Sequence, residues 1–459
     1  MVPPPAGAPH DDLQYSLTKE SLMAQRDGLV TGTNERATRR VVVASLVGTT
    51  IEYYDFAVYG MAASLVLADL FFPSDSSTAS TLAAFATFAV AFVARPIGVV
   101  IFGNLGDRIG RKHSLLLSLI TMGIATVAVG LLPTHGAVGV LAPILLVICR
   151  IFQGIGIGGE WGGAVLLAAE HAPPKKRAVY AAVPNIGPPL GFVVASIVFA
   201  IVSSTTSAAS FAAWGWRIPF LLSAVLIGVG IWMRTRIEES PVFAESAKQE
   251  SAEKAEHVGI PIVTLLRHHW PRVVVGIGAA ISGAGIWYLM SIFSISYGVD
   301  EQGVEKNQMI LAVCIAACVH MALIVPVARL SERIGRRRPM LWGAAGLAIW
   351  SIPMFGLLGT GNAVVIGLGF SVGMVPLTLL YAPICAYLAE LFPVGVRYSG
   401  TSATFITAQI IGGGFAPMIA TALLAGDASP ARLGFYGLLL SLISLLCLWR
   451  GPETKGAGF

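Results

Sequence analysis

Twelve long apolar segments dominate the sequence and restrict what it can fold into. Each is long enough to cross the ~30 Å hydrocarbon core of a bilayer, which needs roughly 20 helical residues. The segments are continuously apolar rather than alternating, which disfavours a membrane β-barrel. They lie near 41–70, 79–102, 114–132, 138–167, 179–203, 216–234, 273–297, 307–328, 340–358, 363–389, 399–424 and 433–449. The sequence therefore predicts an all-α polytopic membrane protein with twelve transmembrane helices.

The distribution of charge predicts how these helices are oriented. Only 12% of the residues are charged, about half of what soluble domains carry. Lys and Arg precede the first apolar segment and follow the second, fourth and eighth, whereas the loops 73–78, 133–137 and 203–213 contain none. Because positive loops stay in the cytoplasm, we expect both termini to be cytoplasmic in an inner or plasma membrane. The net charge of +5 then reflects topology rather than nucleic-acid binding.

The sequence is internally duplicated. GNLGDRIGRK at 103–112 returns as ARLSERIGRR at 328–337, and EHAPPKKR at 170–177 returns as ELFPVGVR at 390–397. Two six-helix bundles around a central path are typical of alternating-access transporters. The expected division is a cytoplasmic tail at 1–40, a bundle at 41–234, a cytoplasmic linker at 235–271, a second bundle at 272–449 and a cytoplasmic tail at 450–459.

Several motifs resemble those of one family. The paired basic hairpins resemble the signature of the major facilitator superfamily. IEYYDFAVYG at 51–60, RIFQGIGIGGEWGGA at 150–164 and WGWRIPFLLS at 214–223 resemble its metabolite:H+ symporter family, and 81–173 is most similar to the shikimate-permease branch. The resemblance implies the fold of that superfamily. It also implies proton-coupled import of a small polar metabolite by alternating access.

Two carboxylates in the first apolar segment are the leading candidates for a proton site. Glu52 and Asp55 are three residues apart, so they share a helical face, and at ~1.5 Å per residue they lie near the middle of the membrane. A charge there costs roughly 2.5–3.5 kcal/mol on insertion scales. The alternative to proton coupling is a structural ion pair with Arg95 or Arg150. Glu160 is a third candidate, either for proton coupling or for an ion pair near the inner face.

Candidate substrate contacts come from both halves. Arg150 and Gln153 share a helical face, and a guanidinium presents a planar fork suited to a carboxylate, either of the substrate or of Glu52. Tyr59 lies one turn after Asp55 and is a candidate substrate donor. The second half adds aromatic and amide side chains, for which packing or a lipid-facing position is the alternative. These candidates are Trp287, Tyr288, Tyr381 and Gln409.

The repeated hairpin predicts a gate on the inner side. Carboxylates at such a turn can pair with arginines and accept from helix N-termini, and the family resemblance implies that these contacts close the cytoplasmic side. A solvated turn is the alternative. The predicted gating residues are Asp107, Arg108, Arg111, Glu332, Arg333, Arg336 and Arg95.

Other patterns exclude several classes of function. Gly154, Gly156 and Gly159 fit G-x-G-x-x-G, but no strand precedes them, so close helix packing explains them better than a dinucleotide site. Cys314 and Cys318 lack a second ligand pair and are interpreted as packing residues rather than metal ligands. His320 is interpreted as a satisfied core histidine, with titration during transport as the alternative.

No catalytic constellation is present, so we expect a transporter and not an enzyme. We expect no cofactor apart from the coupling proton, no metal and no nucleic-acid partner. The predicted protein is a monomer in the bilayer whose substrate is an organic anion such as shikimate or a di- or tricarboxylate. The alternatives are a zwitterionic osmolyte such as proline or betaine, and a drug/proton antiporter.

Overall fold

The computed structural model describes residues 35–109, 111–158, 176–235, 261–393, 396–426 and 429–456. Within these ranges the regular structure is helical and contains no strand. Twelve helices or runs of helices are long and apolar enough to cross a membrane. The prediction of a twelve-helix, all-α membrane protein is confirmed. The end of the fourth predicted segment, beyond Gly158, lies outside the described residues.

Two of the connections between the first six spans contain the small helices α6 (His135–Val138) and α11 (Ala208–Ala213). Three of the spans are built from more than one helical element. In chain order the elements are α2 (Glu35–Ala62), η1 (Ala63–Leu67) and α3 (Ala68–Phe71); α4 (Ser77–Ile109); α5 (Arg111–Leu131); α7 (Leu141–Gly158); α9 (Arg177–Ala182), η3 (Val183–Ile186) and α10 (Gly187–Thr205); and η4 (Gly215–Arg217) with α12 (Ile218–Thr235).

The last six spans follow α14 (Pro261–His268). They are α15 (Trp270–Tyr288), η5 (Leu289–Phe293) and α16 (Ser294–Asp300); α17 (Lys306–Ile334); α18 (Arg337–Gly356) with η6 (Leu357–Thr360); α19 (Ala363–Tyr381) and α20 (Ile384–Leu391); α21 (Arg397–Ala408), η8 (Gln409–Gly414) and α22 (Ala416–Leu423); and α23 (Ala431–Arg450).

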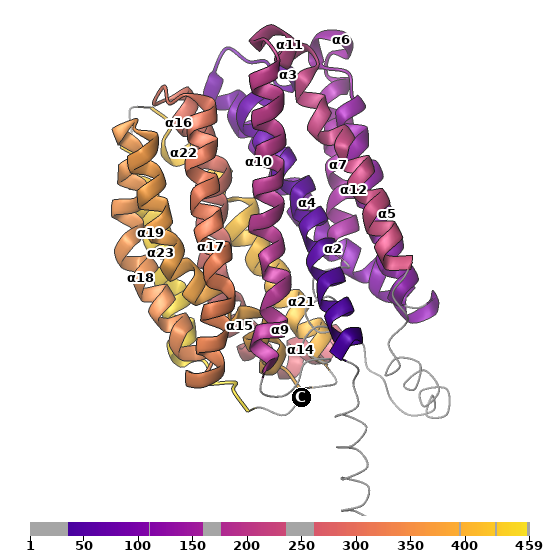
Figure 1. The fold of residues 1–459 in the computed structure, drawn as a ribbon, viewed down its shortest axis with the longest axis vertical. Helices are drawn as coiled ribbons and strands as arrows, with labels where there is room; N and C mark the ends of the chain where they lie inside the picture. Colours follow the sequence, from indigo (N-terminus) through magenta and orange to yellow (C-terminus); the bar gives the residue numbers. More distant parts are fainter. Residues whose placement is uncertain are drawn as a thin grey trace, which may run out of the picture.

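The helices form two neighbouring groups (Figure 1). In the first half α2 packs on α10 and α4 packs on α7, and in the second half α18 packs on α23 and α17 on α19. The two halves meet where α10 packs on α17 and where α4 packs on η8 and α22. The interface between the halves therefore brings residues from distant parts of the sequence together in the middle of the molecule.

Small residues allow α7 to lie very close to α4. A Cβ atom on Gly154 would stand 2.1 Å from the carbonyl oxygen of Ala91, and one on Gly158 would stand 2.1 Å from that of Arg95. These contacts support the interpretation of the glycine-rich segment as a close-packing face. They also fix the positions of Arg95 and Arg150 relative to each other along the two helix axes.

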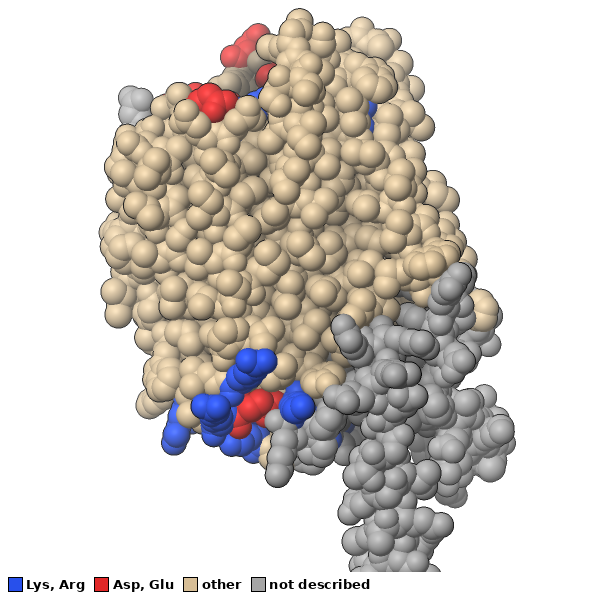
Figure 2. All heavy atoms as spheres, viewed as in Figure 1, with Lys and Arg blue, Asp and Glu red and all other residues tan. Residues whose placement is uncertain are grey.

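Most of the Lys and Arg in view in Figure 2 lie at one end of the surface. Figure 2 shows Lys and Arg gathered at the end where the C terminus lies, and a broad belt without charged side chains on the face in view. We call this end the basic end; Arg333, Arg336, Arg337, Arg338 and Lys455 belong to it. Large apolar side chains such as Ile124, Ile349 and Leu368 are exposed along the spans. A charge-free apolar belt is what a multi-pass membrane protein presents to lipid.

Several spans are interrupted within their length. The elements η1, η5 and η8 are π-helical turns, η3 is a 3-10 turn, and the span of α19 and α20 is broken at Ala382 and Pro383. Such turns shift the hydrogen-bond pattern and often mark functional positions. In transporters, interrupted helices surround the substrate path.

Candidate functional site

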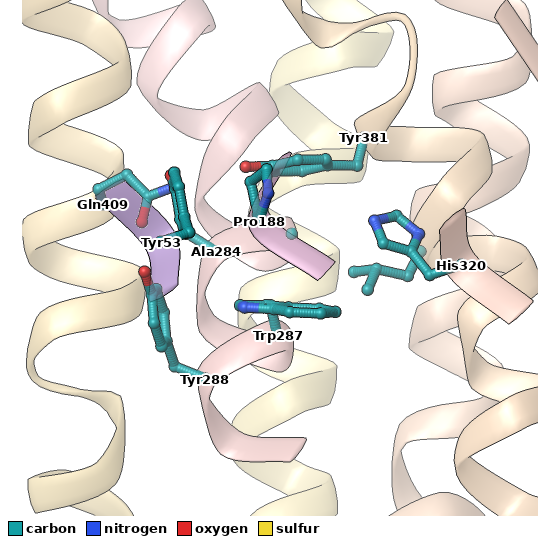
Figure 3. Close-up of a pocket in the computed structure, with 10 residues that line it drawn as sticks. Tyr53, Pro188, Ala284, Trp287, Tyr288, His320, Tyr381 and Gln409 are labelled. Carbon is teal, nitrogen blue, oxygen red and sulfur yellow. The ribbon is translucent and has the colours of Figure 1, made fainter. Parts of the chain in front are cut away.

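A buried cavity lies between the two halves where these interrupted spans meet (Figure 3). Its volume is about 10 Å³, close to the minimum that holds one water molecule. The cavity is therefore narrow in this structure. Its lining residues are Tyr53, Pro188, Gly283, Ala284, Trp287, Tyr288, His320, Leu377, Tyr381 and Gln409.

Four predicted substrate contacts meet in this cavity. Trp287 and Tyr288 come from α15, Tyr381 from the end of α19 and Gln409 from η8. The sequence placed them on three spans without indicating that they face one another. Their grouping supports the prediction that they bind substrate, which no contact in the structure tests.

Aromatic rings form the walls of the cavity. Figure 3 shows the rings of Tyr381 and Trp287 on opposite sides, with Tyr53 and His320 at the flanks. The ring centroids of Trp287 and His320 are 5.6 Å apart, and those of His320 and Tyr381 are 5.9 Å apart. We call these four residues the aromatic box. Among the ten described residues that line the cavity, none is Asp, Glu, Lys or Arg.

His320 is held in one orientation by a short polar chain. Its Nδ1 lies 2.7 Å from the hydroxyl oxygen of Thr378, and that hydroxyl donates to the carbonyl of Met374 at 2.6 Å. If the Thr378 hydroxyl gives its one hydrogen to Met374, Nδ1 is the donor to Thr378. The other ring nitrogen, Nε2, then has a lone pair in the neutral imidazole, and Figure 3 shows it turned toward the cavity. Sequence reasoning found the depth of His320 but not this role in the cavity wall.

A second polar group lies in the first half. The carboxylate of Asp55 accepts from the hydroxyl of Ser223 at 2.6 Å and from that of Thr126 at 3.0 Å. The amide of Gln153 donates to Thr126 Oγ1 at 2.8 Å and accepts from Arg150 Nη1 at 2.7 Å. All five side chains are buried, with at most 1% exposed. Hydrogen bonds through Thr126 and Gln153 thus connect Asp55 to Arg150. We call these four side chains the Asp55–Arg150 network.

Within the described residues, the hydrogen bonds that Arg150 donates all go to residues of the first half. Its Nε donates to the carbonyl of Thr87 and its Nη2 to that of Phe88, each at 3.2 Å. Its guanidinium carbon lies 3.7 Å from the centroid of the Tyr59 ring, and the Tyr59 hydroxyl is hydrogen-bonded to Thr87. Arg150, Gln153 and Tyr59 are not among the residues lining the cavity. Substrate contact by these three stays a prediction and requires a conformation other than this one.

The alternative of an ion pair with an arginine is not what the structure shows for Asp55. Among the described residues its partners are the two hydroxyls, and no arginine pairs with it. The guanidinium of Arg95 instead lies over the rings of Phe92 and Phe56, 4.1 and 4.6 Å from their centroids. Arg95 and the buried Glu52 both lie close enough to Tyr53 and Tyr288 to interact with them electrostatically.

Contacts at the basic end join several predicted gating residues. Arg336 pairs with Glu332 at 2.9 Å and with Glu390 at 3.0 Å. Glu332 also accepts from the backbone N–H of Ala178 at the start of α9, which links the two halves. Burial lowers the pKa of Arg336, but the carboxylates of Glu390 and Glu332 outweigh burial and raise the pKa above its ordinary value, so the guanidinium stays charged.

Sequence reasoning did not predict the pairing of Glu390 with Arg336, and the structure describes the side chains of only some of the predicted gating residues. Glu390 belongs to the second repeat, but the repeat did not indicate that it would pair with Arg336. The side chain of Arg333 is exposed. The side chains of Asp107, Arg108 and Arg111 lie outside the described residues, as does Glu160. Their gating and coupling roles stay predictions.

The halves also touch on the other side of the cavity. The hydroxyl of Ser64 in η1 stands 3.0 Å from the carbonyl oxygen of Ile292 in η5, and a Cβ on Gly60 would clash with the Ile292 side chain at 2.4 Å. Toward the basic end, Asn185 donates to the carbonyl of Tyr381 at 3.1 Å. The cavity is therefore closed on both sides.

A twelve-helix membrane protein with a closed central cavity between two helical halves is a membrane transporter in class. Comparison with known sequences agrees: the family described as "Sugar (and other) transporter" matches residues 40–260 and 263–459. The chain belongs to this family of the major facilitator superfamily. The membership that the motifs indicated is confirmed, and the chain is a transporter rather than an enzyme.

The relatives include proteins named as metabolite transporters. It is 40% identical over 422 residues to "Inner membrane metabolite transport protein YhjE" of Escherichia coli strain K12, covering 91% of this chain and 94% of the relative. It is 35% identical over 387 residues to the shikimate transporter of the same strain, covering 84% and 88%. It is 32% identical over 419 residues to that strain's proline/betaine transporter, covering 89% and 82%.

A solved structure has the same fold. The xylose transporter XylE from E. coli, in a partially occluded inward-open conformation, aligns with a TM-score of 0.73 at 20% identity. The alignment covers 92% of this chain and all of that one. At this identity the likeness extends to the fold alone.

Proposed function

We propose that this protein is a proton-coupled symporter that imports a small polar metabolite by alternating access. One observation carries the proposal: Asp55 lies 13 residues from the start and 16 from the end of the span Val42–Phe71, and its hydrogen-bond partners are neutral hydroxyls. A charge at this depth is costly, and protonation removes it. Hydroxyls can donate to the carboxylate or accept from the carboxylic acid, so both forms of Asp55 can be accommodated.

The proton gradient supplies enough free energy for concentrative uptake. Moving one proton inward yields about 2.3 kcal/mol per 100 mV, and each 1.4 kcal/mol corresponds to about a tenfold concentration ratio. With a neutral or zwitterionic substrate, one coupled proton therefore sustains more than tenfold accumulation at 100 mV, to which a pH gradient adds. With a monoanion the transfer carries no net charge, and the pH gradient alone drives it. Glu52 and Glu160 are further candidates for carrying the proton.

Two sets of contacts suit alternating access. On the basic end, which we place in the cytoplasm with both termini, Glu332 connects the halves through Ala178. On the opposite side, Ser64 and Ile292 connect them. Breaking either set opens the cavity to one side only, and the interrupted spans supply bending points. We propose that one chain in the bilayer is the working unit, since it contains both halves and the cavity, and that the proton is its only coupling agent.

The substrate class has two candidates. An organic anion such as shikimate, or a di- or tricarboxylate, is supported by the buried arginines and by the likeness to a shikimate transporter. A zwitterion such as proline or betaine is supported by a specific observation: the described cavity lining holds aromatic rings and no charged residue. Aromatic faces attract ammonium groups, and a relative is named as a proline/betaine transporter.

Uptake into proteoliposomes tests the proposal. The purified protein is reconstituted, an inside-alkaline pH gradient is imposed, and labelled shikimate, 2-oxoglutarate, citrate, proline and betaine are compared. The expected result is gradient-stimulated uptake of one class, abolished by a protonophore. If the gradient stimulates uptake of none of the five compounds, symport of either class is contradicted. The panel also separates the anion from the zwitterion.

A further inference from the structure

The hydroxyl of Thr126 has more acceptors than it has hydrogens. Its oxygen lies 3.0 Å from Asp55 Oδ2 and 3.0 Å from the carbonyl oxygen of Met122, and it accepts from Gln153 at 2.8 Å. One hydroxyl hydrogen can satisfy only one of the two acceptors at a time. Thr126 therefore has two hydrogen-bonding arrangements at the same heavy-atom positions.

The two arrangements correspond to the two protonation states of Asp55. An ionised carboxylate only accepts, so Thr126 donates to it. A protonated, buried carboxyl must donate its own hydrogen, because an unpaired buried donor is costly. Its nearest acceptors are the oxygens of Ser223 and Thr126. If it donates to Thr126, the Thr126 hydroxyl turns to Met122, and the direction of the Asp55–Thr126 hydrogen bond is reversed.

We propose that Thr126 and Gln153 are positioning residues that transmit the protonation of Asp55 to Arg150. When Thr126 receives the hydrogen of Asp55, the Thr126 oxygen accepts from both Asp55 and Gln153. The hydrogen bond from the Gln153 amide to Thr126 then weakens. Gln153 in turn holds Arg150 Nη1. Protonation of Asp55 thus loosens Arg150, which becomes available to another partner. The proposal rests on the proposed proton symport.

Few other titratable groups surround Asp55. Its own helix carries Glu52 and the tyrosines beside it; α4 contributes Arg95, and α7 contributes Cys149 and Arg150. The neighbouring α10 contains no charged or titratable residue. The charged residue of α12 is Arg234, whose side chain is outside the described residues, and those of α5 lie in its first turn, at the basic end. Within the described residues, the route from Asp55 to Arg150 by hydrogen bonds runs through Thr126 and Gln153.

Variants of Thr126 and Gln153 test the proposal in reconstituted, full-length protein. Thr126→Val keeps the shape of the side chain and removes the hydroxyl, whereas Thr126→Ser keeps the hydroxyl. Thr121→Val is the matched control, because Thr121 on the same helix also bonds the carbonyl four residues earlier but is exposed and bonds no carboxylate. Gln153→Leu breaks the next link. Each protein is assayed for gradient-driven accumulation, for substrate exchange at equal pH, and for the pH midpoint of exchange.

The proposal predicts that Thr126→Val loses gradient-driven accumulation of substrate and keeps substrate exchange. With a one-unit pH gradient and one proton per substrate, the wild type accumulates substrate about tenfold. Thr126→Val is expected to bring this ratio close to one while exchange stays within about twofold, and Gln153→Leu is expected to bring the ratio close to one as well. In Thr126→Val the pH midpoint moves upward by about 0.5–1 unit, because the carboxylate loses a donor that stabilises its charge. Thr126→Ser and Thr121→Val behave as the wild type.

Two results would overturn the proposal. One is a Thr126→Val protein that accumulates substrate with an unchanged pH midpoint. The other is equal loss of accumulation and exchange in a variant that remains monodisperse in detergent, which assigns Thr126 a purely structural role. If the wild type itself does not respond to the pH gradient, the proposed symport has failed, and this outcome is recognised without any variant.

Discussion

Asp55 on α2 and Ser223 on α12 form a hydrogen bond of 2.6 Å although they are 168 residues apart in the sequence. Asp55→Asn keeps the shape and the hydrogen bonding of the side chain but cannot be ionised. We expect this variant to lose gradient-driven uptake while substrate exchange continues, because it mimics the protonated state. Parallel measurement of uptake and exchange checks this. Loss of both activities to the same degree would assign Asp55 to structure and leave Glu52 or Glu160 as the proton site.

Ser223→Ala tests whether the hydroxyl of Ser223 stabilises the ionised form of Asp55. Removing this donor leaves the carboxylate with Thr126 alone among its described partners. We expect the pH midpoint of uptake to move upward, with the largest change at high external pH and little change near the acidic limit, because the ionised carboxylate loses a donor that stabilises its charge. Uptake measured across pH 5 to pH 8 checks the prediction. A uniform reduction at all pH values would contradict it.

The ion pairs of Arg336 predict that removing this side chain weakens the contacts that close the basic end. Arg336 and Glu390 have side chains that are only 3% exposed and are joined by two hydrogen bonds. Breaking a buried pair by removing one partner costs about 3–5 kcal/mol. Arg336→Gln is therefore expected to populate the conformation open at the basic end, detected as faster labelling of a cysteine introduced in the cavity. Arg338→Gln, at an exposed position of the same end and not among the predicted gating residues, is the control and should label as the wild type.

The sequence predicted the spans well because each span is specified locally. A run of about 20 apolar residues with charged ends can satisfy its backbone in a bilayer only as a helix. The internal repeat added the two-bundle organisation before any contact was known. The interruptions at η1, η5 and η8 were not predicted, because a π-turn leaves the apolar pattern of a span intact.

The site was predicted less completely, since facing residues are a property of tertiary packing. The sequence identified Trp287, Tyr381 and Gln409 as cavity candidates by residue type and depth, and the structure groups them. It did not predict Thr126 or Ser223, because an isolated hydroxyl in an apolar helix commonly bonds the carbonyl one turn earlier. Only the packing of α5 and α12 against α2 shows that these hydroxyls also reach Asp55.

Close packing of α7 on α4 predicts a strong stability effect at one glycine and none at another. A Cβ on Gly154 would meet the Ala91 carbonyl oxygen at 2.1 Å, whereas a Cβ on Gly228 would meet nothing within 4 Å. We expect Gly154→Ala to destabilise the protein by about 1–3 kcal/mol and Gly228→Ala to be neutral or slightly stabilising. Thermal unfolding of the two variants in the same detergent compares them directly. Equal melting temperatures would contradict the close helix contact.

The aromatic box predicts how substrate affinity responds to loss of a ring. If a zwitterion is the substrate, Trp287→Leu removes a face that attracts its ammonium group, a contribution of about 0.5–2 kcal/mol, so affinity should fall by roughly 2- to 30-fold. Trp342→Leu, at an exposed position, is the control and should bind as the wild type. Binding measured by isothermal titration with proline, betaine and shikimate checks the prediction. An equal loss of affinity for shikimate would point to ring stacking rather than attraction to a cation, because shikimate carries no ammonium group.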